Sequence, residues 1–170
     1  MRVGHGWDIH RLVAGRQFKL GGVAIEWDKG PLGHSDGDAL LHALCDALLG
    51  ACALGDIGLH FPDSDPKWKG CDSGRFVTAA VEMASGRGFK PVNADVTIIL
   101  EAPKLAPYRE AITKNVASLL GLPEDRANVK AKTAEGLGPE GVGDAVSCHA
   151  VVLVEELPLL GLLKVQGVTF

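Results

Sequence analysis

Residues 145–155 read Ala-Val-Ser-Cys-His-Ala-Val-Val-Leu-Val-Glu, a run rich in β-branched residues that is typical of a strand. Both of its alternating sets are mostly apolar, with Val146, Cys148, Ala150 and Val152 in one and Val151 and Leu153 in the other. Such a strand is expected to be buried on both faces of its sheet. Helices would cover one face, and in a chain this short the other face is expected to meet another subunit.

The chain before this strand shows further strand and helix patterns. Strands are expected over 1–12, 92–100 and 127–133, with short strands and loops over 13–34. Helices are expected over 39–52, 73–87 and 105–121. The segments 55–72 and 134–144 are rich in turn residues and are expected to be loops. This order predicts an α+β fold of two layers (α/β two-layer), with helices on one face of a sheet.

Three residues mark expected helix ends. Ser35 and Asp38 form an S-x-x-D pattern that resembles a capping box ahead of the first helix. Ser73 is expected to cap the second helix, and Gly121 to end the third.

Length and composition predict a single domain, residues 1–157, followed by a C-terminal tail, residues 158–170. Apolar residues make up 46% of the chain and charged residues 22%, which is ordinary for a globular protein. The net charge of −4 disfavours binding to nucleic acid or to an acidic membrane surface. The apolar run at Leu157–Leu163 is too short to span a bilayer, and the N-terminus does not resemble a signal peptide. Four cysteines without a C-x-x-C pair indicate reduced thiols in a cytoplasmic protein.

Asp8 and His10 lie two residues apart on the first expected strand, so their side chains project from the same face. A carboxylate and an imidazole in this arrangement can bind one zinc ion, and His42 on the first helix is the natural third ligand. Three protein ligands leave one tetrahedral position for substrate, which is the pattern of catalytic zinc. Taken singly, His10 is better explained as a surface residue and His42 as a satisfied core histidine.

The first expected helix carries a polar stripe, because Asp38, His42 and Asp46 recur every four residues among apolar neighbours. Either aspartate could orient the imidazole of His42 from behind. The segment 34–38 at the start of the same helix could favour phosphate binding, or Ser35 could simply cap the helix. The polar residues of 55–58 and 61–65 are ordinary turn residues when taken alone. The lysines of 102–107 and 130–135 can pair with phosphate or remain solvated.

Five segments in register resemble one family, the 2-C-methyl-D-erythritol 2,4-cyclodiphosphate synthases of the non-mevalonate isoprenoid pathway. They are Met1–His10, Gly33–His42, Gly55–Asp63, Leu100–Lys104 and Lys130–Glu135. The resemblance covers residues 1 to about 155. It implies conversion of 4-diphosphocytidyl-2-C-methyl-D-erythritol 2-phosphate to the 2,4-cyclodiphosphate with release of CMP, by a homotrimer with sites at its subunit interfaces.

The resemblance also implies roles for individual residues. Asp8, His10 and His42 would hold one Zn²⁺ per subunit, and Glu135 would hold Mg²⁺ or Mn²⁺ with the substrate diphosphate. His34 and Thr133 would assist the transition state. The residues implied to bind substrate are Asp8, His10, His34, Ser35, Asp56, Ile57, Gly58, Phe61, Pro62, Asp63, Ser64, Asp65, Ala102, Pro103, Lys104, Leu105, Ala106, Lys132, Thr133, Ala134 and Glu135.

The chain departs from the family pattern around the expected trimer axis. Pro139, Val142 and His149 stand where the family often has Phe, Arg and Glu. Without the arginine, an isoprenoid diphosphate loses its bidentate partner, so we expect no binding of that ligand there. Lys132 stands where the family commonly has a small hydroxyl residue, and its ammonium could contact phosphate or face water.

Two other functions use the same residues. A zinc-dependent phosphohydrolase would need a water molecule at the open metal position and would release linear phosphate. A trimeric binding module with structural zinc would need a fourth protein ligand, for which Asp8, His10 and His42 have no obvious companion.

Overall fold

The structure is a computed structural model that describes residues 1–157, so the expected tail at 158–170 lies outside the described residues. Its elements run in the order β1 (Arg2–Ala14), β2 (Phe18–Leu20), β3 (Val23–Ile25), β4 (Lys29–Pro31), α1 (Ala39–Ala51), α2 (Ile57–His60), η1 (Pro66–Trp68), α3 (Gly74–Gly86), β5 (Phe89–Ile99), α4 (Arg109–Leu120), η2 (Glu124–Arg126), β6 (Ala127–Lys132), α5 (Gly138–Gly141) and β7 (Ala145–Glu156). None of the described helices has the length and apolar character needed to cross a membrane.

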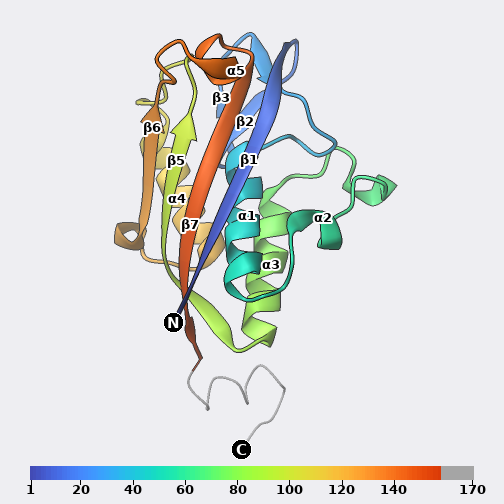
Figure 1. Ribbon diagram of the computed structural model, residues 1–170, viewed down its shortest axis with the longest axis vertical. Coiled ribbons are helices and arrows are strands. Elements are labelled where there is room, and N and C mark those ends of the chain that lie inside the picture. Colours follow the sequence, from blue (N-terminus) through green and yellow to red (C-terminus); the bar gives the residue numbers. More distant parts are fainter. Residues whose placement is uncertain (158–170) are drawn as a thin grey trace, which may run out of the picture.

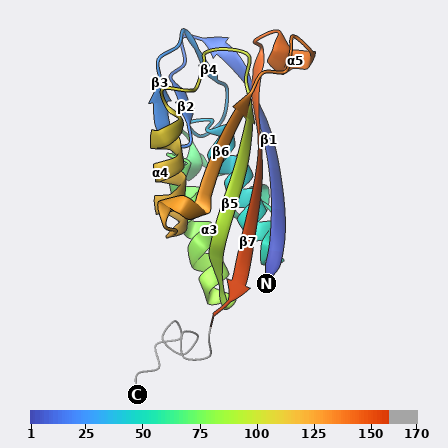
Figure 2. The same ribbon diagram turned by 90° about the vertical axis from the view of Figure 1, so that its left-hand side faces the viewer.

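The main sheet has the strand order β4-β1-β7-β5-β6, and β2 and β3 form a separate hairpin (Figure 1). Strands β5 and β6 are parallel, whereas β1 pairs antiparallel with β4 and β7, and β7 pairs antiparallel with β5. Figure 2 shows α3 and α4 on one face of the sheet that contains β1 and β7. The expected two-layer α+β fold is therefore confirmed.

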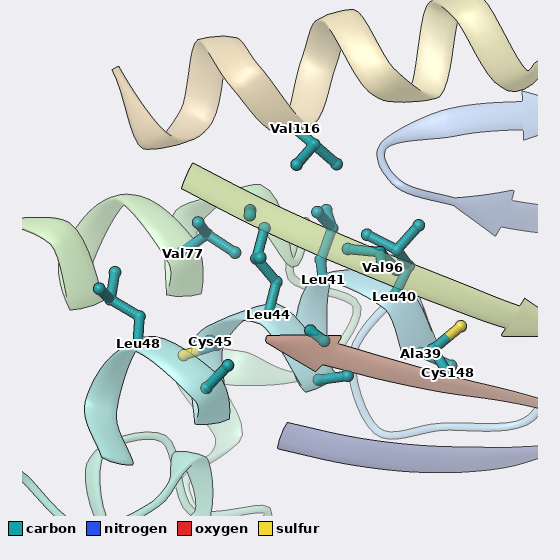
Figure 3. Close-up of a cluster of buried hydrophobic side chains, with 14 of the residues drawn as sticks. Ala39, Leu40, Leu41, Leu44, Cys45, Leu48, Val77, Val96, Val116 and Cys148 are labelled. Carbon is teal, nitrogen blue, oxygen red and sulfur yellow. The ribbon is translucent and has the colours of Figure 1, made fainter. Parts of the chain in front are cut away.

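The core lies between the sheet and the helices. Leu40, Leu44 and Leu48 of α1 are fully buried, and Figure 3 shows them beside Val77 of α3 and Val96 of β5. On β7 the even-numbered residues from 146 to 154 are fully buried beneath the helices. Burial of so many aliphatic side chains, at roughly 25 cal/mol per Å² of apolar surface, is the main stabilising contribution to this packing.

The opposite face of the sheet is apolar and uncovered in the single chain. Val3 is 66% exposed, Trp7 50% and Val151 39%. These three residues have odd numbers on β1 and β7, so their side chains project away from the helices. The doubly apolar pattern of β7 thus corresponds to one face in the core and one face open to a further packing partner.

Three helix ends differ in part from the expectations. Asp38 caps α1, accepting a hydrogen bond from the Leu41 N–H, so the expected cap by Ser35 is wrong. Ser73 occupies the N-cap position of α3, but its side chain makes no capping hydrogen bond. Helix α4 begins at Arg109 rather than at 105, because Pro107 disfavours the helical conformation of the residue before it. Gly121, with φ of 65°, ends α4 as expected.

The two segments expected to be loops contain short helices. Within 55–72, Asp56 caps α2 and Asp65 caps η1 through their carboxylates, so these two turn residues are helix caps. Within 134–144, α5 begins just before Pro139, a position where proline is well tolerated. Strand β5 starts at Phe89, earlier than expected, because a bulge between Pro91 and Asn93 accommodates the proline.

Candidate metal centre and substrate cavity

Two glycines on β1 bring helix α1 unusually close to the sheet. A Cβ atom added at Gly4 would lie 1.9 Å from the carbonyl oxygen of Ala47, and one at Gly6 would lie 2.0 Å from that of Ala43. Real Cβ atoms never approach that closely, so only glycine fits at either position. Gly4, Gly6, Asp8 and His10 share one face of the strand, and the close approach sets His42 of α1 beside Asp8.

The three expected metal ligands converge at this point. The Oδ2 atom of Asp8 lies 2.9 Å from Nδ1 of His10 and 3.1 Å from Nδ1 of His42. All three ligand atoms lie within 4.8 Å of one another. Ligand atoms around a tetrahedral zinc ion with bonds of about 2.0–2.2 Å are separated by roughly 3.3 Å, so the cluster has the dimensions of a metal site.

The state of His10 supports this assignment. Its Nδ1 atom is buried and has no hydrogen-bond partner within residues 1–157, although it lies 2.9 Å from the Asp8 carboxylate. The two atoms are close enough for an ion pair but are not aligned for a hydrogen bond. A buried nitrogen left in this way is costly unless a ligand satisfies it, and a shared metal ion does so. The donor set therefore fits a divalent cation such as zinc.

Charge interactions within the cluster shift two pKa values. Burial acts to raise the pKa of Asp8, but the neighbouring imidazoles of His10 and His42 outweigh it and hold that pKa well below its usual range. Burial acts to lower the pKa of His42, and the Asp8 carboxylate outweighs it and raises that pKa. The metal-free cluster thus favours an ionised carboxylate, which is the form that binds a cation.

The polar stripe on α1 is not what orients His42. Asp38 is fully buried and accepts hydrogen bonds from the backbone N–H groups of Gly21, at 2.8 Å, and Gly22, at 2.6 Å. Asp46 accepts one from the N–H of Ile57 at 2.7 Å. Neither carboxylate contacts the imidazole, so the expectation that one of them orients it is wrong. Both instead connect α1 to loops, and Asp38 does so from within the core.

A cavity of about 490 Å³ opens beside the cluster. Its lining includes the third metal ligand, His42, and nine residues of the implied substrate-binding set: Asp8, His10, His34, Ser35, Ile57, Gly58, Phe61, Pro62 and Asp63. Asp56, Ser64 and Asp65 are not part of the lining. The structure therefore gathers segments 8–10, 34–42 and 57–63 around one cavity.

Other lining residues had no clear signal in the sequence. Arg11, Trp68 and Phe76 also line this cavity, and Trp68 and Phe76 pack edge to face with ring centroids 5.5 Å apart. The Nε2 atom of His34 and the Nε1 atom of Trp68 are buried and lack hydrogen-bond partners in the described chain. Both are candidate donors to a bound anion.

A second cavity, of about 280 Å³, gathers six of the remaining implied residues. Its lining includes Pro103, Lys104, Leu105, Ala106, Lys132 and Thr133, together with Leu100, Glu101, Ala131 and Arg109. Ala102, Ala134 and Glu135 do not line it. Glu135 has a positive φ of 54° and accepts a hydrogen bond from the Thr133 hydroxyl at 2.7 Å. A strained backbone at such a position is typical of functional loops.

The two cavities are separate and share no residue. The first includes α2 and the second includes the end of β6, and Figure 1 shows these elements on opposite sides of the molecule. One chain by itself therefore does not unite the two groups of implied substrate-binding residues.

Comparisons with known proteins agree on one family. The model of the YgbB family matches residues 1–155. The chain is 54% identical over 154 residues to the 2-C-methyl-D-erythritol 2,4-cyclodiphosphate synthase of Trichlorobacter lovleyi, covering 91% of this chain and 98% of that protein. It is 55% identical over 156 residues to the protein of the same name from Dechloromonas aromatica, covering 92% and 98%. A solved synthase structure described as a CDP-bound form matches with a TM-score of 0.84 at 45% identity, covering 91% of this chain and 100% of that one.

Proposed function

This chain belongs to the YgbB family, and we infer from this that it is a 2-C-methyl-D-erythritol 2,4-cyclodiphosphate synthase. Its reaction converts 4-diphosphocytidyl-2-C-methyl-D-erythritol 2-phosphate to 2-C-methyl-D-erythritol 2,4-cyclodiphosphate and CMP, in the non-mevalonate isoprenoid pathway. We take residues 1–157 as the catalytic domain. The observation that carries the proposal is the convergence of Asp8, His10 and His42 at the edge of a cavity large enough for a phosphorylated sugar.

The reaction depends mainly on positioning the two phosphate groups of the substrate and on stabilising their negative charge. The 2-phosphate of the substrate is already an anion and attacks the β-phosphorus, so no strong base is needed. Asp8, His10 and His42 would hold a zinc ion, which when bound supplies a Lewis acid to phosphate oxygens. His34, whose buried Nε2 lacks a partner in the described chain, would donate to a phosphate oxygen and lower the repulsion between the two anions.

The nucleotide part of the substrate is assigned to the second cavity. Lys104 and Lys132 there offer cationic groups to the diphosphate, and Thr133 offers a hydroxyl. Glu135 would hold Mg²⁺ or Mn²⁺, which proteins commonly bind through one carboxylate together with substrate phosphates. A solved relative at 45% identity is described as bound to CDP, which supports a cytidine diphosphate ligand for this chain.

We further propose that the enzyme is a homotrimer in which neighbouring subunits join the two cavities. The separation of the cavities in one chain supports this, as does the exposed apolar face formed by Val3, Trp7 and Val151. Burying that face between subunits would remove a patch that monomers rarely expose. In a cyclic trimer each interface is the same, so each can form one complete site.

Zinc-dependent phosphohydrolysis is the weaker alternative, because relatives covering nearly the whole chain are named as cyclodiphosphate synthases. The product decides between the two activities. Wild-type protein incubated with the cytidyl substrate, Zn²⁺ and Mg²⁺ is expected to release CMP and the cyclic diphosphate, as read by mass spectrometry. His42→Ala is expected to release neither. Release of linear phosphate instead of the cyclic product would contradict the assignment.

A mixing experiment tests the shared site. His42→Ala damages the first cavity and Thr133→Ala the second, so each variant alone should be nearly inactive. When the two are coexpressed and mixed trimers are purified through two different tags, one interface in each trimer unites two intact halves. Mixed trimers should then regain about one third of wild-type activity. A monomeric native mass, or no recovery in verified mixed trimers, would contradict the model.

The cavity expected on the trimer axis is not expected to bind an isoprenoid diphosphate. Val142 is 66% exposed, and His149 lies 3.2 Å from His5 between Nδ1 and Nε2. The residues at these positions include no arginine to pair with a diphosphate. Calorimetry with geranyl diphosphate should show no binding in the micromolar range, and such binding would contradict this expectation.

A further inference from the structure

The nitrogen of His42 that faces away from Asp8 lies against two buried hydroxyl groups. Its Nε2 atom is 2.9 Å from Oγ of Ser73 and 3.1 Å from Oγ of Ser35. Ser73 is fully buried and Ser35 is 7% exposed, so water does not compete for these contacts. A hydroxyl group can donate or accept, and these two distances alone leave open which nitrogen of the imidazole carries the proton.

Asp36 resolves the direction of these hydrogen bonds. Its Oδ1 atom accepts the hydroxyl hydrogen of Ser73 at 2.5 Å, and its Oδ2 atom accepts the Ser73 N–H at 3.3 Å. A serine hydroxyl has one hydrogen, so Ser73 has none left to donate to His42. The contact of 2.9 Å therefore requires that Nε2 of His42 carries the proton and donates it to Ser73. Lys19, with Nζ 3.5 Å from Oδ2 of Asp36, adds a positive charge beside the carboxylate.

We propose that Asp36 and Ser73 are positioning residues for the metal ligand His42. Asp36 fixes the hydroxyl of Ser73, and Ser73 fixes the proton of His42 on Nε2, which leaves the lone pair of Nδ1 directed at Asp8 and His10. Carboxylates and hydroxyls that hold the far side of a ligating histidine fix its tautomer and ring orientation in this way. The proposal rests on the metal centre proposed above and adds to it residues that do not touch the ion.

The positions of these residues along the chain explain why the sequence alone did not indicate that they contact one another. Asp36 precedes α1, His42 lies in its first turns, and Ser73 lies 31 residues later at the start of α3. Ser73 has the sequence signature of a helix cap, yet its hydroxyl makes no capping bond and is directed to Asp36 and His42 instead. The Ser73 hydroxyl thus forms hydrogen bonds at the metal centre in place of a capping bond in its own helix, which supports a role for Ser73 at that centre.

Two substitutions test the proposal by different routes. Ser73→Ala removes the acceptor for Nε2 of His42. Asp36→Asn keeps the shape of the side chain but replaces one hydrogen-bond-accepting oxygen with an amide nitrogen that donates. An amide nitrogen at the Oδ2 position would oppose the Ser73 N–H and the Lys19 ammonium, whereas at the Oδ1 position it opposes only the Asp38 N–H, 3.3 Å away, so it takes the Oδ1 position and donates to Ser73. Ser73 is then free to donate its hydrogen to Nε2 of His42, which would move the imidazole proton to Nδ1, where it competes with the metal.

The measurement is metal binding by the whole protein, independent of turnover. Zinc affinity is read by competition with a chromophoric chelator, and ligand geometry by the visible absorption of the Co²⁺-substituted protein. Both variants are expected to bind zinc about 10–100-fold more weakly than wild type and to alter the cobalt spectrum. Ser73→Thr, which keeps the hydroxyl, should recover most of the affinity. Ser85→Ala on the same helix is the matched control and should bind zinc as wild type does.

The outcomes separate this proposal from the metal centre itself. Wild-type affinity and an unchanged cobalt spectrum in both Ser73→Ala and Asp36→Asn would overturn the positioning role. A wild-type chain that binds no zinc would overturn the metal centre and this proposal with it. If Ser73→Ala does not fold, as thermal melting of the metal-free protein would show, Asp36→Asn alone decides, because it preserves volume and loses only the backbone contact from the Asp38 N–H to Oδ1.

Discussion

Replacing Gly6 with alanine is the sharpest test of how the fold builds the metal centre. The new Cβ would lie 2.0 Å from the carbonyl oxygen of Ala43 and 2.7 Å from the backbone nitrogen of Ala47. Both neighbours are backbone atoms of α1, so no rotation of a side chain relieves the contact. The helix has to move away from β1.

The size of the displacement follows from the contact distances. Cβ atoms essentially never lie closer than 3.0 Å to another heavy atom, so α1 must shift by at least the difference between 3.0 and 2.0 Å, about 1 Å. His42 directly precedes Ala43 in the chain, so the shift reaches it undiminished. Metal–ligand distances tolerate changes of roughly 0.2 Å, and a shift of this size therefore disrupts the site.

Two measurements are expected to change together. Overpacking of this kind costs about 1–3 kcal/mol of folding free energy, which lowers Tm by about 2–12 °C for a chain of this length. Zinc affinity, read by chelator competition, should fall by more than about tenfold. Thermal melts are to be run at one protein concentration, since assembly of subunits also contributes to Tm.

Gly50→Ala provides the matched control. Gly50 lies on the same helix, and a Cβ added there meets nothing within 4 Å. It should raise stability by about 0.5–1 kcal/mol and leave zinc affinity unchanged, because alanine is the better helix former. If Gly6→Ala melted like wild type and bound zinc as tightly, the close approach of α1 would not be what places His42. Adding Ala43→Gly to Gly6→Ala should not restore binding, because the clash is with backbone.

Three further predictions concern the core and the metal. Asp38→Ala should lower the free energy of unfolding in urea by about 3 kcal/mol or more, because it removes a helix cap and leaves the buried N–H groups of Gly21 and Gly22 without an acceptor; a loss below 1 kcal/mol would contradict this. Burial raises the pKa of the thiols of Cys45, Cys52 and Cys148, so thiolate is scarce at pH 8 and these groups should react with Ellman's reagent only after denaturation; rapid labelling of the native protein would count against the packing described. Removing zinc with a chelator should lower Tm, since zinc at 1,000 times its dissociation constant stabilises by about 4 kcal/mol; in His42→Ala the same treatment should change Tm little.

Much of the layout could be predicted from periodicity and caps, because these are local properties of the chain. The alternation of residues 145–155 and the helical spacing after Asp38 led to the two-layer fold, and the structure confirms it. The D-x-H spacing placed Asp8 and His10 on one face of a strand, which holds whatever surrounds the strand. Family resemblance, rather than spacing, supplied the substrate and most of the binding residues.

Partners of polar side chains were harder to predict, because they depend on how elements cross. The stripe of Asp38, His42 and Asp46 was correctly identified as unusual, but its aspartates bind loop backbone and do not contact the imidazole. Short aspartates in the segment 55–72 were expected to be turn residues, and two of them cap helices instead. In each case the sequence indicated that the polar residue has a structural or functional role, but it did not indicate which group that residue binds.

The sequence by itself therefore determined the layers of the fold and the three candidate metal ligands, since strand and helix periods decide which residues share a face. Only the tertiary structure decided which residues contact these ligands from the side away from the metal site. It alone also decided that the implied substrate-binding residues fall into two separate cavities. The approach of α1 to Gly4 and Gly6 brings His42 to Asp8, and the crossing of α3 brings Ser73 to His42. The two cavities lie apart because α2 and the edge strand β6 lie on opposite sides of the molecule, a separation that no local pattern encodes.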